Sequence, residues 1–251
     1  MGIGKILYQD LPNAISAIRQ IGFINKVKSR GLGFKLVSDN WITKYRVRTF
    51  NEKEPEMLDW VDGNLRDDDI LFDVGANIGI YSIYAALRKP KATIYAFEPE
   101  YSNLNQLKQN IINNSLQSTI IPFSIALGDN TGISYLHIQD ITPGSALHTV
   151  STQSLEHSQT GQDVVWKEGI ACFTIDDLCE MTGIKPTLIK IDVDGNETEI
   201  LNGGKNTFRN KELRSVYIEI DPKQAQCESI LRGYGFDLEQ KPSENQIWTR
   251  K

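Results

Sequence analysis

The sequence is poor in cysteine and has no long apolar run. Its 251 residues include three cysteines, Cys172, Cys179 and Cys227. An odd number at wide spacing supports neither a disulfide framework nor a pair of metal-ligating cysteines. No apolar stretch approaches the roughly 18 residues of a membrane-spanning helix, and the first residues lack the apolar segment of a secretory signal. These absences predict a cytoplasmic protein without a transmembrane segment.

Acidic residues are scarce at the N-terminal end. Residues 1–50 hold nine Lys and Arg against two Asp and Glu, a net charge of +7, which leaves −12 for residues 51–251. Binding to nucleic acid depends on many contacts between basic side chains and phosphates, so the acidic body argues against such a partner. We expect a basic N-terminal extension, residues 1–50, packed on a single domain, residues 51–251.

The N-terminal extension has apolar residues at helical spacing. Residues 11–28 repeat Ile or Val about one helical turn apart, which predicts an amphipathic helix packed on the main body. A helix at a membrane surface, with residues 11–48 in contact, is the less favoured alternative. Alternation of apolar and polar residues predicts short strands in FKLV at 34–37 and in YRVRTF at 45–50.

From Ile70 onwards, short β-rich runs alternate with helical stretches. This alternation predicts an α/β fold with a mostly parallel sheet and helices on both faces. The expected strands are 70–74, 93–97, 120–125, 188–192 and 215–220, followed by an edge hairpin of 236–239 and 246–249. The expected helices cover about 55–65, 79–88, 101–113, 197–209 and 223–233.

The alternation lapses between residues 128 and 171. This insertion, about 130–170, carries all three histidines, His137, His148 and His157. A long irregular insertion in a compact domain is usually a functional loop or a lid. We therefore expect residues 130–170 to form an insertion or a loop at the acceptor site.

A glycine-rich turn, VGANIG, follows the first strand of the regular part. Such a turn exposes the first N–H groups of the following helix, and glycine lets a ligand approach the backbone closely. The dinucleotide fingerprint G-x-G-x-x-G is absent, since Asn77 stands between Gly75 and Gly79. Asp73, just before the turn, disfavours a diphosphate and suits a ligand with a cationic end.

Glu98 ends the next strand, 19 residues beyond Gly79. At this spacing a carboxylate can accept hydrogen bonds from both ribose hydroxyls of a nucleoside. The sequence thus predicts a nucleoside ligand with a cationic end. An NAD-dependent oxidoreductase is the alternative that shares the sheet and the ribose-binding acid.

Acidic residues also gather in LIKIDVDGNETEILNGG, residues 188–204. Lys190 and Asp192 share one face of a strand, and Asp192 stands at its carboxyl end, where open α/β sheets bind ligands. Asp194 follows on the loop, and Glu219 ends the neighbouring strand. Helix capping and an ion pair to Lys190 are the structural alternative to a functional site, and for Asp194 the two interpretations stay open.

Four motifs taken together resemble one family. They are FDVGANIGIYS, YAFEPEYSNLNQLKQNIINN, TIDDL and IKIDVDGNETEILNGG, and over about residues 46–220 they resemble the FkbM-type S-adenosylmethionine-dependent methyltransferases. The resemblance implies the class I methyltransferase fold, a Rossmann-like seven-stranded sheet of order 3-2-1-4-5-7-6 with the last strand antiparallel. It also implies methyl transfer to a hydroxyl oxygen, frequently on a sugar of a glycan or on a natural product.

The same resemblance implies residues that bind the cofactor. Asp73, Gly75, Asn77 and Gly79 would surround the methionine part of S-adenosylmethionine, and Glu98 would hold its ribose.

Further positions carry over from the later motifs and from the segment ahead of the first strand. Ile125 and Ala126, after the third strand, would flank the adenine. Asp192 would border the reacting centre, with Lys190 beside it in the catalytic group. Glu54 would cover the cofactor site.

The group that takes the proton from the acceptor hydroxyl stays open. His148 is the first candidate, because histidine titrates near neutrality and the insertion can fold over the sheet edge. His137, His157 and Asp192 are alternatives.

Two further alternatives concern the chemistry as a whole. A divalent cation held by Asp192, Asp194 and Glu219 could lower the pKa of a sugar hydroxyl, but we do not favour it because no histidine is close in sequence. A catalytically silent module would bind S-adenosylmethionine without any acceptor. The expected partner is a small-molecule or glycan acceptor whose identity the sequence does not contain.

Overall fold

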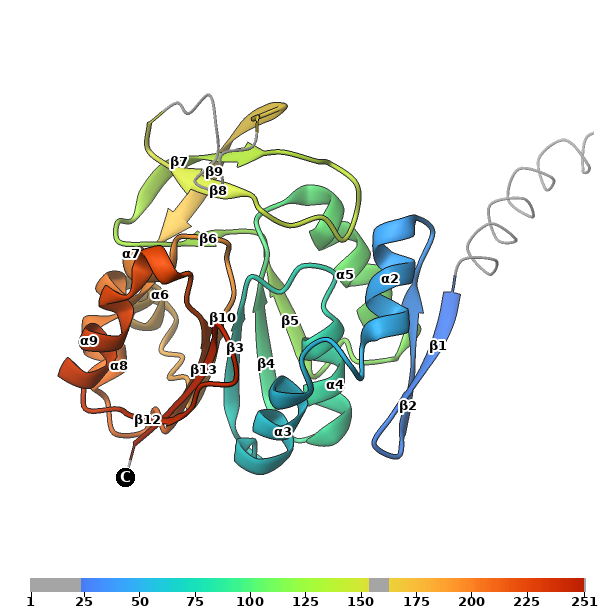
Figure 1. Cartoon of the computed structure of the whole chain (residues 1–251), viewed down its shortest axis with the longest axis horizontal. Coiled ribbons are helices and arrows are strands. Elements are labelled where there is room, and N and C mark those ends of the chain that lie inside the picture. The colour runs from blue at the N-terminus through green and yellow to red at the C-terminus, as the bar shows by residue number, and fades with distance from the viewer. Residues whose placement is uncertain (1–23, 154–162, 251) are drawn as a thin grey trace, which may run out of the picture.

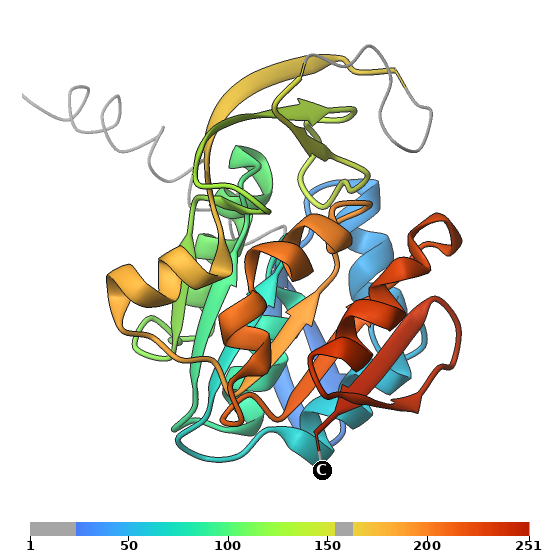
Figure 2. The same ribbon diagram turned by 90° about the vertical axis from the view of Figure 1, so that its left-hand side faces the viewer.

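The structure, a computed structural model, describes residues 24–153 and 163–250 (Figure 1). In this part of the chain a seven-stranded sheet carries helices on both faces, and a four-stranded sheet lies across one end of it (Figures 1 and 2). No helix within these residues is long and apolar enough to cross a membrane. The predicted α/β class is confirmed.

The large sheet is parallel apart from one strand. In chain order its strands are β3 (Ile70–Val74), β4 (Thr93–Phe97), β5 (Ile120–Phe123), β10 (Leu188–Ile191), β11 (Ser215–Glu219), β12 (Asp237–Gln240) and β13 (Asn245–Thr249). Their spatial order is β12-β13-β11-β10-β3-β4-β5, and β13 runs antiparallel to both of its neighbours. Counted 1 to 7 along the chain, the order read from β5 is 3-2-1-4-5-7-6.

Helices bury apolar faces against both sides of this sheet. One side carries α3 (Pro55–Asn64), α4 (Ile80–Arg88) and α5 (Tyr101–Asn113). The other side carries α6 (Ile175–Thr182), α7 (Glu197–Gly203), α8 (Lys205–Arg209) and, after a 3₁₀ turn at Pro222–Gln224, α9 (Gln226–Gly233). The single helix predicted over 197–209 is two helices, because the pair Gly203-Gly204 favours a break and Gly204 has a non-helical backbone.

Residues 24–37 form a β-hairpin. β1 (Ile24–Ser29) pairs antiparallel with β2 (Leu32–Val37), which confirms the strand predicted in FKLV. The predicted helix is wrong over residues 24–28, and its first part, 11–23, lies outside the described residues. Arg30 and Gly31 join the strands with φ of 47° and 85°, and two successive residues at positive φ make the turn that hairpins favour.

α2 (Trp41–Thr49) stands where a strand is predicted at 45–50, so that prediction is wrong. The side-chain oxygen of Asn40 accepts a hydrogen bond from the backbone N–H of Thr43 at 3.0 Å, and the hydroxyl of Thr43 accepts one from the backbone N–H of Asn40 at 3.4 Å. This reciprocal capping box starts a helix, and it outweighs the alternation in YRVRTF.

The hairpin packs on the main body, because Val27 of β1 and Phe34 of β2 lie in one apolar core with α4 and α5.

The insertion forms most of a second sheet. Its strands are β6 (Ala126–Leu127), β7 (Gly132–Ile138), β8 (Thr149–Ser151) and β9 (Trp166–Phe173), paired in the order β6-β9-β7-β8. Much of the insertion predicted over 130–170 is therefore strand, because β7 and β9 pair across a long connection that local patterns do not reveal. Only Ser124 and Ile125 separate β5 from β6, which places the small sheet over the carboxyl ends of the parallel strands (Figure 2).

The glycine-rich turn after β3 permits close packing. Gly75 has φ +75°, and a Cβ there would lie 1.9 Å from the carbonyl oxygen of Asp192, just after β10. Gly79 has φ +79°, and a Cβ there would lie 2.1 Å from Cδ1 of Leu107 in α5. The turn thus brings the ends of β3 and β10, and the helices α4 and α5, into direct contact.

We expect Gly75→Ala to lower the free energy of unfolding by about 3 kcal/mol or more, because the new methyl group meets backbone atoms and the residue must keep a positive φ. Gly63→Ala is the matched control, since nothing lies within 4 Å of a Cβ added there and alanine favours the helix α3. Urea denaturation of both variants measures the difference. Equal stability of the two variants would contradict the packing described for Gly75.

Candidate active site

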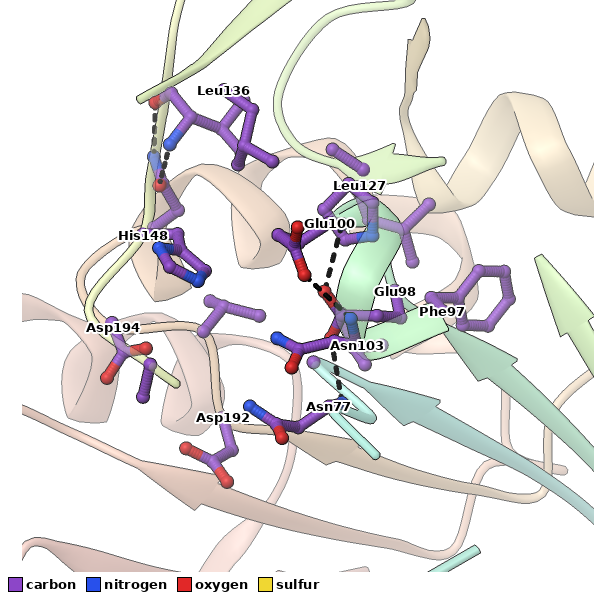
Figure 3. Close-up of a pocket in the computed structure, with 18 of the residues that line it drawn as sticks. Asn77, Phe97, Glu98, Glu100, Asn103, Leu127, Leu136, His148, Asp192 and Asp194 are labelled. Carbon is purple, nitrogen blue, oxygen red and sulfur yellow. Dashed lines mark hydrogen bonds between the residues drawn. The ribbon is translucent and has the colours of Figure 1, made fainter. Parts of the chain in front are cut away.

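A cavity of about 70 Å³ lies at the carboxyl ends of the parallel strands, beneath the small sheet (Figure 3). The predicted site residues on its lining are Gly75, Asn77, Glu98, Ile125, Ala126, His148 and Asp192. In the view of Figure 3, His148, Asp194 and Asp192 lie on one side of the cavity and Phe97, Glu98 and Leu127 lie on the other. The fold therefore brings the glycine-rich turn, the strand-end acids and the insertion to one place.

Glu98 is fixed by the backbone around it. Its Oε2 accepts a hydrogen bond from the backbone N–H of Asn77 at 2.7 Å, and its Oε1 accepts one from the N–H of Glu100 at 3.0 Å. The residue is 5% exposed, and burial raises the pKa of Glu98 to about 7 against the effect of these two donors. Each oxygen retains a further lone pair, so the carboxylate can accept hydrogen bonds from two hydroxyl groups of a ligand.

The wall next to Glu98 is apolar. Its lining residues are Phe97, Ile125, Ala126, Leu127 and Leu136. Ile125 and Ala126 lie where the chain leaves β5 and enters β6. A flat heterocycle attached to a ribose would bury its faces against this wall while Glu98 binds the sugar.

The loop between β7 and β8, residues 139–148, reaches into the cavity. The carbonyl oxygen of Ser145 accepts hydrogen bonds from Nδ2 of Asn77 at 2.7 Å and from Nδ2 of Asn103 at 3.2 Å. Oδ1 of Asn103 in turn accepts one from the backbone N–H of Gly144 at 2.7 Å. Two side-chain amides of the cavity are thus bound to this loop.

The N-terminal part of the chain holds the same loop from its other side. Nδ2 of Asn40 donates to the carbonyl oxygen of Pro143 at 2.9 Å, and Nε of Arg46 donates to that of Gly144 at 2.7 Å. A Cβ on Gly144 would lie 2.9 Å from Cγ2 of Thr43. The helix α2 therefore supports the loop that reaches into the cavity.

Sequence reasoning misses Asn103, Ser145 and Arg46. A signal exists for Asn103, because it recurs with Gln106 and Asn110 at helical spacing and all three are buried on α5. Buried polar residues at helical spacing indicate side chains that bind another segment. Ser145 and Arg46 carry no comparable signal, since the bond from Arg46 joins residues 98 positions apart.

Lys190 joins the carboxyl ends of β3 and β10 beside the cavity. Its ammonium group lies 3.0 Å from Oδ1 of Asp73 and 3.3 Å from Oδ2 of Asp192, and it donates to the carbonyl oxygen of Gly75 at 3.1 Å. Burial alone would lower the pKa of Lys190, but Asp73 and Asp192 raise it above its usual value. Because each of its three donors has a partner, Lys190 is suited to position its neighbours rather than to carry a proton.

Four predicted site residues, Glu54, Asp73, Gly79 and Lys190, stand outside the set that lines the cavity. Asp73 also accepts a hydrogen bond from Oγ of Ser82 at 2.5 Å. Glu54 is buried, forms an ion pair with Lys53 at 2.6 Å and hydrogen-bonds Tyr81. The side chains of Glu54, Asp73 and Lys190 are thus bound by other groups of the protein.

Asp192 and Glu219 share a hydrogen bond at neighbouring strand ends. Burial and the charge of Asp192 raise the pKa of Glu219 to about 9. Burial acts to raise the pKa of Asp192 as well, but Lys190 lowers it overall. At neutral pH Glu219 therefore carries the shared proton and Asp192 is ionised.

Asp194 follows Asp192 by two residues and lies on the same side of the cavity (Figure 3). Burial and the neighbouring Asp192 raise the pKa of Asp194 to about 6, while the backbone N–H of Leu147 donates to its Oδ2 at 2.7 Å.

Within residues 24–153 and 163–250, no group of three or more His, Cys, Asp or Glu side chains is arranged to hold a metal ion.

Of the two candidate histidines that the structure describes, His137 and His148, His148 lies on the cavity. Its Nε2 lies 3.4 Å from Oγ of Ser145, and its Nδ1 has no hydrogen-bond partner among the described residues. Burial lowers the pKa of His148 below its usual value, so the ring is neutral at pH 7. His137 is buried on β7 with Nε2 at 3.0 Å from the carbonyl oxygen of Gln153, and His157 lies outside the described residues.

Known proteins match this chain over most of its length. The family model of the methyltransferase FkbM domain matches residues 73–238. The hexuronic acid methyltransferase AglP of Haloferax volcanii is 31% identical over 160 residues, which cover 62% of this chain and 59% of that protein. The 31-O-demethyl-FK506 methyltransferase FkbM of Streptomyces tacrolimicus is 28% identical over 202 residues, covering 71% of this chain and 77% of that protein.

A solved structure shares the fold. It is the SAM-dependent methyltransferase from Agrobacterium tumefaciens, which superposes with a TM-score of 0.52 at 9% identity and covers 92% of this chain and 71% of that chain. The seven-stranded sheet with helices on both faces is therefore the class I methyltransferase fold.

We expect Lys190→Met to lower the free energy of unfolding by about 3–5 kcal/mol, because it leaves the carboxylates of Asp73 and Asp192 close together without a counter-charge. The double variant Lys190→Met/Asp73→Asn removes one of these charges, and we expect it to recover part of the loss. Chemical denaturation measures both. A single variant as stable as the wild type would show that the ion pairs do not fix the strand ends.

Proposed function

Because this chain belongs to the FkbM methyltransferase family, we propose that it transfers a methyl group from S-adenosylmethionine to a hydroxyl oxygen, on a sugar of a glycan or on a natural product. The observation that carries this proposal is Glu98, a carboxylate fixed at the end of β4 next to an apolar wall and to the turn after β3. The names of the two relatives support the choice of acceptor, since one names an O-demethyl substrate and the other a sugar acid.

The cavity lining fits the parts of S-adenosylmethionine. Glu98 would accept hydrogen bonds from the ribose hydroxyls, and Ile125 and Ala126 would flank the adenine. Asn77 and the ionised Asp192 would surround the methionine part, where a carboxylate suits the ammonium and sulfonium charges.

The buried residues beside the lining would hold this arrangement in place. Asp73 and Lys190 fix the backbone of Gly75 and the side chain of Asp192. Gly79 sets the approach of α4 to α5. Glu54 binds Lys53 and Tyr81 near Asp192.

The size of the cavity implies that the loop 139–148 moves when a ligand binds. Pockets for small-molecule ligands such as S-adenosylmethionine commonly measure about 300–1,000 Å³, whereas this cavity measures about 70 Å³. The carbonyl group of Ser145 is bound to the amides of Asn77 and Asn103, so a shift of this one peptide frees two hydrogen-bonding groups and enlarges the space.

The chemistry needs alignment, exclusion of water and a proton acceptor. S-Adenosylmethionine, when bound, supplies a methyl group that is attacked in line by an oxygen nucleophile. The small sheet and the loop 139–148 cover the site and exclude water. Nδ1 of His148 is free to accept the hydroxyl proton, and Asp192, held ionised by Lys190, is the alternative acceptor.

We expect Glu98→Ala to weaken binding of S-adenosylhomocysteine by roughly 1.5–3 kcal/mol, because it removes hydrogen bonds to a charged acceptor. Isothermal titration calorimetry measures the change, with Glu239→Ala on the exposed surface of β12 as the control. NAD is titrated in parallel. Binding of NAD but not of S-adenosylhomocysteine would favour the oxidoreductase alternative, and an unchanged dissociation constant in Glu98→Ala would remove Glu98 from the site.

The affinity for S-adenosylhomocysteine depends on pH through Glu98. With a pKa of about 7 in the free protein, Glu98 is protonated at lower pH, and hydrogen bonds from ribose hydroxyls favour its ionised form. Affinity therefore rises with pH up to about 7, by at most about tenfold per pH unit, and then levels off. Calorimetry between pH 5.5 and 8.5 measures this, and Glu98→Gln is expected to lose the dependence. A wild-type affinity that is flat over this range would count against the role of Glu98.

We expect His148→Ala to bind S-adenosylhomocysteine within a few-fold of wild type but to turn over about 10²–10⁴ times more slowly, which is the usual contribution of a general base. Because the pKa of His148 is lowered, wild-type turnover should stay constant at neutral pH and fall only below pH 6.5. Tritium transfer from labelled S-adenosylmethionine to an accepted sugar measures both. Near-normal turnover of the variant would assign the proton to Asp192, and cofactor binding without any transfer would indicate a silent module.

A further inference from the structure

A second cavity, of about 190 Å³, opens at the carboxyl ends of β10 and β11. It adjoins the cofactor cavity, because Asp194 lines both. Glu219, on its lining, is hydrogen-bonded to Asp192, which lines the cofactor cavity. The second cavity is thus next to the side of the site where Asp192 and Asp194 lie.

The lining of this cavity is strongly acidic. Its acidic residues are Asp194, Glu197, Glu219, Asp221 and Glu244, of which Glu219 holds the proton that it shares with Asp192. Among the described residues of the lining, Lys223 supplies the single basic side chain. Asp221, Lys223 and Glu244 are exposed at the rim, whereas Asp194, Glu197 and Glu219 lie deeper.

Glu197 offers an acceptor atom that the protein itself leaves unused. The residue is 2% exposed, and its Oε1 accepts a hydrogen bond from the backbone N–H of Gly195 at 3.0 Å. Its Oε2 has no hydrogen-bond partner among the described residues. A buried carboxylate oxygen without a donor is costly, so a ligand that donates a hydrogen bond here stabilises the site.

The acidic groups deep in the cavity raise one another's pKa values. Burial raises the pKa of Glu197 to about 7 and that of Glu219 to about 9, and in both cases the charges of Asp192 and Asp194 add to the effect. This mutual repulsion is relieved by a positive charge inside the cavity and increased by a negative one.

We propose that this acidic cavity, defined by Asp194, Glu197, Glu219, Asp221 and Glu244, binds the methyl acceptor and selects one that carries a primary ammonium group, such as an amino sugar. The role as acceptor site rests on the proposed methyl transfer, whereas the preference for a cation rests on the cavity alone. The chain then differs from its relative named for a hexuronic acid, since a carboxylate ligand would meet five acidic side chains.

The test compares glucose with two probes that each differ from it in one substituent, glucosamine and glucuronic acid. Thermal unfolding is followed at increasing probe concentration, with and without S-adenosylhomocysteine, because a ligand that binds the folded state raises Tm by mass action. We expect glucosamine to bind at least tenfold more tightly than glucose, and glucuronic acid to give no shift. Equal shifts for glucosamine and glucose, or a larger shift for glucuronic acid, would overturn the proposal.

Variants test whether the preference for glucosamine arises in the acidic cavity. Glu197→Gln/Glu244→Gln keeps the shape of both side chains, and we expect it to lose most of the preference for glucosamine over glucose. Glu212→Gln, an exposed residue outside the cavity, is the matched control and should behave as wild type. A double variant that keeps the full preference would overturn the proposal, as would a larger Tm shift with calcium ions than with glucosamine.

Calorimetry with S-adenosylhomocysteine on the same samples separates the two proposals. We expect its affinity to be unchanged in Glu197→Gln/Glu244→Gln. If the wild type does not bind S-adenosylhomocysteine, the proposed function is contradicted. The comparison of glucosamine with glucose then still tests whether the acidic cavity prefers a cation.

Discussion

The buried ammonium group of Lys190 is the contact on which the carboxyl edge of the sheet depends. It binds Asp73 at the end of β3, the carbonyl group of Gly75 in the next turn and Asp192 after β10. Gly75 lies against the backbone of Asp192 so closely that a side chain does not fit. The charge of Lys190 keeps Asp192 ionised, and Asp192 in turn sets the protonation of Glu219. One cation thus determines both the shape of the site and the distribution of protons in it.

The main sheet could be predicted from the sequence because its signals are local. Each parallel strand is a short apolar run followed by a helical pattern, and β3, β4 and α5 agree with their predicted bounds. The errors at residues 24–28 and 45–50 arise where a local signal of another kind decides the structure. The capping box at Asn40 and Thr43 makes a helix of an alternating segment, and the Arg30-Gly31 turn makes a hairpin of a segment with helical spacing.

The residues of the candidate site also fall into those that the sequence could predict and those that it could not. Gly75, Asn77, Glu98 and Asp192 belong to strand ends, so their meeting at one edge follows from the parallel sheet, which a sequence pattern can reveal. The contacts of Asn103, Ser145 and Arg46 join distant segments through a loop of the second sheet. No spacing rule describes such contacts, because they depend on how β7, β8 and β9 pair.

The loop 139–148 is a common wall of both cavities. Ser145 is bound to the amides of Asn77 and Asn103, and two residues later Leu147 donates to Asp194, with both Leu147 and Asp194 held at positive φ. Non-glycine residues in this conformation store strain of about 1–3 kcal/mol each. Ser145 lines the first cavity and Leu147 the second, so a shift of this segment would change both linings at once. If both cavities bind ligands, thermodynamic linkage makes any coupling through this segment reciprocal.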